Sequence, residues 1–148
     1  MKIHLFVFFV EKNKYALRLS KVERIIPVMR ITPLPSAPEI VMGVINIEGN
    51  IIPTLNIRKR FGLQEKELNL YDKIIIAYTA KQRVAIVVDD VAGVVEYEEE
   101  KLIPSKEFLP VLPYFDGVMA LEDQIILIHD IDRFLSINEE CLLEAALC

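Results

Sequence analysis

The stretch GVINIEGNIIPTL, from Gly43 to Leu55, places two apolar arms around a short polar turn. Gly49-Asn50 suits a two-residue hairpin, because glycine tolerates the positive φ that a type II′ turn requires at its first central position. Pro53 lacks an amide proton, which favours an edge position for the second arm. The stretch therefore predicts a β-hairpin, with Glu48 one residue before its turn.

Apolar runs predict strands through most of the remaining chain. Residues 3–10 (IHLFVFFV) form a continuous run, which is typical of a strand that is buried on both faces. Pro27 makes an edge position the best place for residues 24–31. Residues 73–79 and 83–91 predict a second hairpin. Further strands are expected at 15–19, 114–121 and 124–129.

Helix signals are short and local. The spacing of Ser20 and Glu23 is that of a capping box and predicts a helical turn. Asn56 is expected to cap a short helix that stops at Gly62. The basic triplet 58–60 is interpreted as the solvated face of that helix. Asn138 is expected to cap a C-terminal helix over 138–147.

A faint internal repeat relates two parts of the chain. Residues 43–63 can be laid without gaps over residues 117–137. The identical pairs are Gly43/Gly117, Val44/Val118, Glu48/Glu122, Ile51/Ile125, Ile52/Ile126 and Ile57/Ile131. Asn56 and Asp130 also correspond as helix caps. A chance match between two hairpin-plus-helix units is the alternative, and a true repeat would mean two related β units.

Composition indicates a globular protein of one domain. The 148 residues carry 17 Lys+Arg against 22 Asp+Glu, a net charge of −5, and the basic residues are scattered. The run 3–10 is too short to cross a bilayer and is not followed by a signal-peptide cleavage site. Cys141 and Cys148 would lie about 10 Å apart along a helix, beyond the reach of a disulfide. We therefore expect a reduced, cytoplasmic protein.

Residues that could carry catalysis or hold a metal are sparse. The five glycines are isolated, and neither the histidines nor the cysteines have metal-ligand spacing. His129 and Asp130 could form an acid/base pair, but we expect His129 to end a strand and Asp130 to cap a helix. The residues themselves thus indicate a β-rich interaction module rather than an enzyme, without cofactor or metal.

Residues 37–63 resemble the segment by which CheW-like domains are recognised. The matching positions are Gly43, Val44, Asn46, Gly49, Pro53 and Arg58. The resemblance covers nearly the whole chain, through residues 6–26, 83–96 and 114–136. Several distinct motifs in the right order make this a specific match.

The resemblance implies a mainly β fold of two small SH3-like, five-stranded barrels, with short helices and a C-terminal helix, in one CheW-like domain over 1–148. It implies a non-catalytic scaffold that couples the regulatory domain of a CheA-type histidine kinase to the cytoplasmic tips of chemoreceptors. Such a protein would be cytoplasmic, recruited to membrane-associated receptor arrays, and would need neither a cofactor nor insertion into the membrane.

The resemblance also implies a receptor-binding groove with an apolar floor and a polar rim. Its residues would be Val22, Arg24 and Ile25 on one side and Gly43, Asn46 and Glu48 on the other. The family typically has arginine where this chain has Glu48, and often glutamate where it has Arg24. We therefore expect a salt bridge between Arg24 and Glu48, and a partner from a divergent pathway that suits the reversed charges.

Two other classes of protein compete with this interpretation. A small nucleic-acid-binding β-barrel would need a basic face with exposed aromatic residues, which the chain of charge −5 does not indicate. A cofactor-free enzyme would have to use His129 and Asp130. The cognate kinase and receptor, the pathway output and the role of Cys141 and Cys148 do not follow from the sequence.

Overall fold

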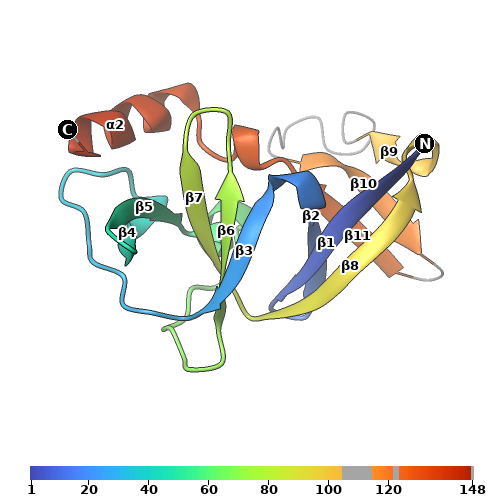
Figure 1. The fold of residues 1–148 in the computed structure, drawn as a ribbon, viewed down its shortest axis with the longest axis horizontal. Coiled ribbons are helices and arrows are strands. Elements are labelled where there is room, and N and C mark those ends of the chain that lie inside the picture. The colour runs from blue at the N-terminus through green and yellow to red at the C-terminus, as the bar shows by residue number, and fades with distance from the viewer. Residues whose placement is uncertain (105–114, 122–123, 148) are drawn as a thin grey trace.

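The computed structural model describes residues 1–104, 115–121 and 124–147, which fold into two β-sheets that lie side by side (Figure 1). The five-stranded sheet has the order β3-β6-β7-β5-β4 and the six-stranded sheet the order β8-β1-β2-β11-β10-β9. The strands of the first are β3 (Val22–Pro27), β6 (Lys73–Tyr78), β7 (Arg83–Val88), β5 (Asn50–Leu55) and β4 (Val41–Ile47). Those of the second are β8 (Asp90–Glu98), β1 (Lys2–Val10), β2 (Asn13–Arg18), β11 (Gln124–His129), β10 (Phe115–Leu121) and β9 (Ile103–Pro104).

Short helical elements connect or cover the strands. They are the 3-10 turns η1 (Leu19–Lys21), η2 (Glu99–Lys101) and η4 (Ile131–Arg133), and the α-helices α1 (Ile57–Phe61) and α2 (Ile137–Leu147). The chain starts in the six-stranded sheet, crosses into the other sheet with β3, and returns with β8 (Figure 1). The two sheets are therefore built from interleaved parts of the chain.

The register of the strands confirms the internal repeat. Without β9, the two sheets have the same order of strands, with β4 and β5 equivalent to β10 and β11. The register of β4 shifts between Val41 and Gly43, and that of β10 shifts at the equivalent place, between Phe115 and Gly117. The match between Glu48 and Glu122 lies partly outside the described residues. The two halves therefore resemble each other in structure as well as in sequence.

Close backbone approach explains why glycine occurs at both shifts. A Cβ atom at Gly43 would lie 2.3 Å from the carbonyl oxygen of Thr32, and one at Gly117 would lie 3.1 Å from that of Ile103. Thr32 pairs with Val44 across this contact, as Ile103 pairs with Val118 in the other sheet. Each glycine therefore lets a further segment close the edge of its sheet.

Among the described residues, the apolar core has three parts, which follow from the alternation of side chains along the central strands. In β1, Leu5 and Val7 fill the interior of one barrel, whereas Phe6 and Phe8 enter a cluster shared by both barrels. In β6, the run 74–77 divides in the same way between the second barrel and the shared cluster. This explains the continuous apolar runs, because both faces of these strands are buried.

The structure confirms several predicted caps and corrects others. Asn56 accepts a hydrogen bond from the Lys59 amide (3.0 Å), and Gly62 ends α1 with φ 72°. The α2 helix begins at Ile137, and its cap is Ser136 rather than Asn138, because the Ser136 hydroxyl accepts from the Glu139 amide at 3.1 Å. A helical turn is present near Ser20 as η1, but the predicted capping box was wrong, because Ser20 lies inside the turn, Glu23 lies in β3, and the turn has no side-chain cap.

Two predictions for the β4–β5 hairpin were wrong. Its turn consists of Glu48 and Gly49, with φ of 51° and 88°, because Ile47 pairs with Asn50. Positive φ at both positions indicates a type I′ turn rather than type II′. Strand β5 is not an edge strand, since β7 pairs with it from Thr54 onward, one residue after Pro53. Pro53 therefore lies outside the residues of β5 that pair with β7.

Candidate functional site

The outer edge of the five-stranded sheet is formed by β3, as Pro27 predicted. Arg24 and Ile25 are exposed on this strand, whereas Val22 is half-buried and packs against the shared core. Ile25 has 37% of its surface accessible. Because consecutive residues of a strand point to opposite faces, the edge presents a charge on one face and an apolar group on the other.

Glu23 holds Arg24 in place. Its carboxylate accepts hydrogen bonds from Tyr78 Oη at 2.9 Å, Arg83 Nη1 at 3.1 Å and Arg24 Nε at 3.1 Å. The bond from Tyr78, followed by those from the arginines, lowers the pKa of Glu23, and the same bond raises the pKa of Tyr78. The expected Arg24–Glu48 salt bridge is therefore wrong, because Arg24 pairs with the residue next to it.

The tip of the β4–β5 hairpin presents Glu48. The side-chain oxygen of Asn46 accepts from the Gly49 amide at 2.9 Å, which fixes the turn. Glu48 is exposed, and in the described part of the chain it makes no ion pair. Gly43 lies in the same strand but is buried, so its role is to admit the Thr32 backbone.

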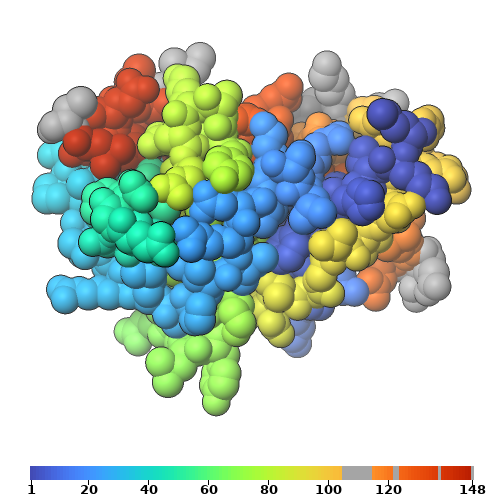
Figure 2. Space-filling view, in the orientation of Figure 1, coloured from blue at the N-terminus to red at the C-terminus, as the bar shows by residue number. Residues whose placement is uncertain are grey.

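The hairpin and the segment that follows β3 pack into one surface. Ile26 of β3, together with Val28 and Ile31 of the following segment, packs against the buried cluster that contains Ile45 and Ile52 of the hairpin. Figure 2 shows the hairpin beside this segment on one face of the molecule. Four of the predicted residues are exposed, Arg24 and Ile25 on β3 and Asn46 and Glu48 on the β4–β5 hairpin.

An open groove continues this region toward the N-terminal strand. It has a volume of about 350 Å³ and is lined by Ile3, His4, Arg18, Leu19 and Ser20. These residues come from β1, the end of β2 and η1, immediately before Val22 in the chain. No local sequence signal distinguishes these residues, because they become neighbours only when the strands pair.

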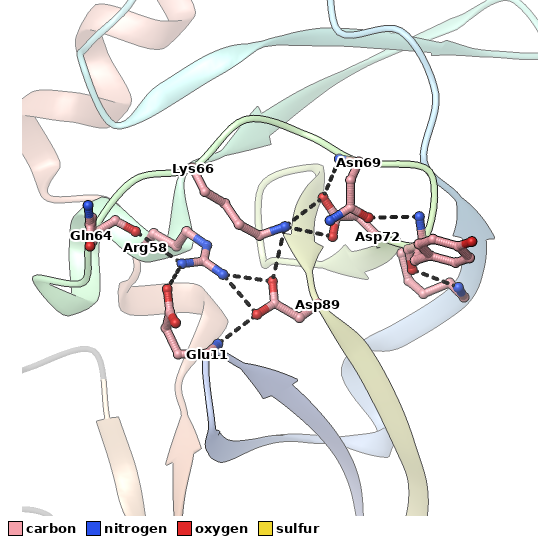
Figure 3. Close-up of polar contacts among 9 residues, drawn as sticks. Glu11, Arg58, Gln64, Lys66, Asn69, Asp72 and Asp89 are labelled. Atoms are coloured by element: carbon pink, nitrogen blue, oxygen red, sulfur yellow. Dashed lines mark hydrogen bonds and ion pairs between the residues drawn. The ribbon is translucent and has the colours of Figure 1, made fainter.

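A partly buried charged cluster lies between the barrels (Figure 3). Arg58 of α1 donates from Nη2 to both carboxylate oxygens of Asp89 at 2.8 Å and from Nη1 to the carbonyl of Gln64 at 3.0 Å. It also pairs with Glu11, whose amide donates to Asp89 at 2.7 Å. Burial lowers the pKa of Arg58, but the bonds to Asp89 and Glu11 more than offset this effect.

This cluster connects the two barrels. Glu11 lies in the turn between β1 and β2, Arg58 in the helix that follows β5, and Asp89 between β7 and β8. Arg58 is 9% exposed, so the interpretation of the basic triplet as a solvated helix face was wrong for this residue. The spacing of these residues in the sequence gave no signal of their contact.

His129 and Asp130 have the structural roles that were predicted for them. His129 ends β11 and is 2% exposed, in edge-to-face contact with Phe61 and Phe134. Burial lowers the pKa of His129 to about 3, so the imidazole is neutral at pH 7. Asp130 accepts a hydrogen bond from the Asp132 amide at 3.1 Å at the start of η4.

The described residues include neither a metal-binding cluster nor a membrane-spanning helix. No group of three or more His, Cys, Asp or Glu side chains there could hold a metal ion. None of the helices in that part of the chain has the length and apolar character needed to span a bilayer. Cys141 is a free, exposed residue of α2, and Cys148 lies outside the described residues.

The fold defines a class of protein: a module of two β-barrels that presents charged and apolar residues on exposed strands and turns. The CheW-like domain family matches residues 4–139, and the chain belongs to this family.

Known proteins support the assignment over most of the chain. The chemotaxis protein CheW of Klebsiella aerogenes is 28% identical over 140 residues, covering 93% of this chain and 84% of that protein. CheW of Thermotoga maritima is 30% identical, covering 86% and 84%. The crystal structure of the scaffolding protein TtCheW from Thermoanaerobacter tengcongensis aligns with a TM-score of 0.84 and 27% identity, covering 94% and 96%. The predicted fold is confirmed, and the nucleic-acid-binding alternative finds no support among these relatives.

Proposed function

We propose that this chain is a non-catalytic scaffold that couples the regulatory domain of a CheA-type histidine kinase to the cytoplasmic tip of a chemoreceptor. The observation that carries the proposal is a CheW-like fold over residues 4–139. Its two interleaved barrels act as one domain, and membrane-associated receptor arrays recruit it. The kinase and receptor have separate surfaces on it.

The receptor-binding surface includes the exposed part of β3 and the β4–β5 hairpin. Arg24 and Ile25 present a cation and an apolar group from the two faces of this edge strand, and Asn46 holds the turn from which Glu48 projects. Val22 and Gly43 contribute indirectly, because they are packed and support the strands. A helical hairpin would lay its apolar face against Ile25 and its polar flanks against the two charges.

The two charges set the specificity of this surface. Glu23 fixes the Arg24 guanidinium at 3.1 Å, whereas Glu48 is held only through the backbone of its turn. A suitable receptor tip therefore places an acidic residue opposite Arg24 and a basic residue opposite Glu48. A tip with the reverse pattern meets like charges on both sides, which disfavours binding.

Calorimetric titration with the cognate kinase regulatory domain and with a receptor-tip fragment tests the proposal. We expect both to bind. The double variant Arg24→Glu with Glu48→Arg is expected to prefer receptor tips of the reverse charge pattern and to leave kinase affinity unchanged. Failure of the kinase domain to bind the unaltered protein would overturn the coupling function. An unchanged receptor preference in the double variant would overturn only the specificity.

A further inference from the structure

The segment between α1 and β6 exposes two adjacent apolar side chains. Leu70 is 89% exposed and Tyr71 is 81% exposed, more than Ile51 or Ile125 at the tips of the two hairpins. The segment projects from the body of the molecule below β6 (Figure 1). Contiguous apolar side chains of this size on a surface commonly mark a contact with another protein.

This exposure is built into an ordered turn. The Asn69 amide donates to Asp72 Oδ2 at 3.0 Å, and the Asp72 amide donates to the Asn69 carbonyl at 3.2 Å. The Tyr71 amide donates to Asn69 Oδ1 at 2.8 Å. The polar groups of the turn are thus paired among themselves, and both apolar side chains point outward.

Charged groups fasten the turn to the body of the protein. Asp72 is 2% exposed and accepts from Lys66 Nζ at 3.0 Å, while the same nitrogen lies 3.9 Å from Asp89 in the inter-barrel cluster (Figure 3). Lys73 Nζ donates to the Tyr71 carbonyl at 2.9 Å. A turn that is held from within loses little conformational entropy when it binds a partner, which favours affinity.

The turn is continuous with the edge strand β3. The Val28 amide, one residue past the end of β3, donates to the Asp72 carbonyl at 3.2 Å. Ile25 lies three residues earlier, about 10 Å along an extended chain. An α-helix covers about 10 Å in roughly seven residues. A single helix of a few turns can therefore contact Ile25 and the Leu70–Tyr71 turn together.

We propose that Leu70 and Tyr71 form a second contact for the helical receptor tip, an extension of the β3 surface. This inference rests on the proposed function. The partner helix presents apolar residues at i, i+3 and i+4 toward the turn. A basic residue beside them suits Glu67, which is exposed on the same segment.

The double variant Leu70→Ala with Tyr71→Ala tests the contact by calorimetry against a receptor-tip fragment and against the kinase regulatory domain. We expect receptor affinity to fall about tenfold and kinase affinity to be unchanged. The thermal midpoint should also be unchanged, because both side chains are exposed. Ile125→Ala, which truncates an exposed aliphatic residue of β11 in the other barrel, is the matched control and should leave receptor affinity unaltered.

Variants of Lys66 distinguish the contribution of the ordered turn from that of the Leu70 and Tyr71 side chains. Lys66→Ala keeps Leu70 and Tyr71 but removes the pair with Asp72, so receptor affinity should fall and the amide protons of the turn should exchange faster. Lys66→Arg should restore both. Unchanged receptor affinity in the double variant, or an equal loss toward the kinase, overturns the inference. If the unaltered protein binds neither partner, the proposed function itself has failed.

Discussion

Removing the carboxylate of Asp89 tests the physical account of the inter-barrel cluster. In Asp89→Asn, the Arg58 guanidinium loses its charged partner, and one amide oxygen replaces the two carboxylate oxygens that accept from it at 2.8 Å. Breaking a buried ion pair from one side costs about 3–5 kcal/mol. Glu11 and the Gln64 carbonyl remain as partners of Arg58, and the Asp89 side chain is 27% exposed. We therefore expect the free energy of unfolding to fall by about 2–3 kcal/mol.

Urea denaturation and thermal unfolding measure this change. For a chain of this size, each kcal/mol shifts the thermal midpoint by about 2–4 °C, so Asp89→Asn should lower it by about 4–12 °C. The matched control is Glu96→Gln, which removes an exposed carboxylate 3.1 Å from Lys2 Nζ in β1. It should leave the midpoint unchanged. A loss below about 0.5 kcal/mol in Asp89→Asn would show that the cluster does not hold the barrels together.

Further predictions concern single positions. The pKa of His129 falls from 6.5 in the unfolded chain to about 3 in the folded protein. The stability that the neutral imidazole contributes is therefore fully present above pH 6.5 and declines as the pH falls toward 3. In His129→Phe, urea titrations at successive pH values should show a shallower decline of the unfolding free energy. Gly43→Ala should cost about 1–3 kcal/mol in urea unfolding, because its Cβ would meet the Thr32 carbonyl, and Gly117→Ala should cost less. Glu48→Gly should raise the unfolding free energy by about 0.5–1 kcal/mol, since φ is 51° at that position; a loss would refute the assigned turn.

Local signals predicted most of the secondary structure correctly. The run 3–10 forms the nine-residue strand β1, because both of its faces pack against apolar clusters. The caps at Asn56 and Asp130 depend on neighbours within three residues, so their side chains were sufficient evidence. The internal repeat was visible because the same hairpin occurs in both sheets with the same register.

Contacts between distant parts of the chain could not be predicted. Glu11, Arg58 and Asp89 meet only after the strands have paired, and each alone resembles an ordinary surface charge. The expected partner of Arg24 was wrong for a related reason. Charge reversal at two positions suggested a pair, but Glu23 is adjacent to Arg24 and is anchored by Tyr78 and Arg83.

The turn of the β4–β5 hairpin shows a different limit. Glycine favours the first central position of a type II′ turn, and this preference predicted Gly49-Asn50. Both turns place Ile45, Ile47 and Ile52 on the same face of the hairpin, so burial of these residues does not select between them. The observed turn, in which Glu48 has positive φ, is supported by the hydrogen bond of 2.9 Å from the Gly49 amide to the side-chain oxygen of Asn46.

The crossings at β3 and β8 affect the order in which the protein can fold during synthesis. All strands of the five-stranded sheet lie between residues 22 and 88, so this sheet can form as soon as that part of the chain has left the ribosome. Strands β1 and β2 are made first but must wait for β8 and β11, which pair with them across gaps of about a hundred residues. The first hairpin to be synthesised therefore belongs to the last sheet to be completed, and until then its apolar face is open to chaperones or to the wrong partner.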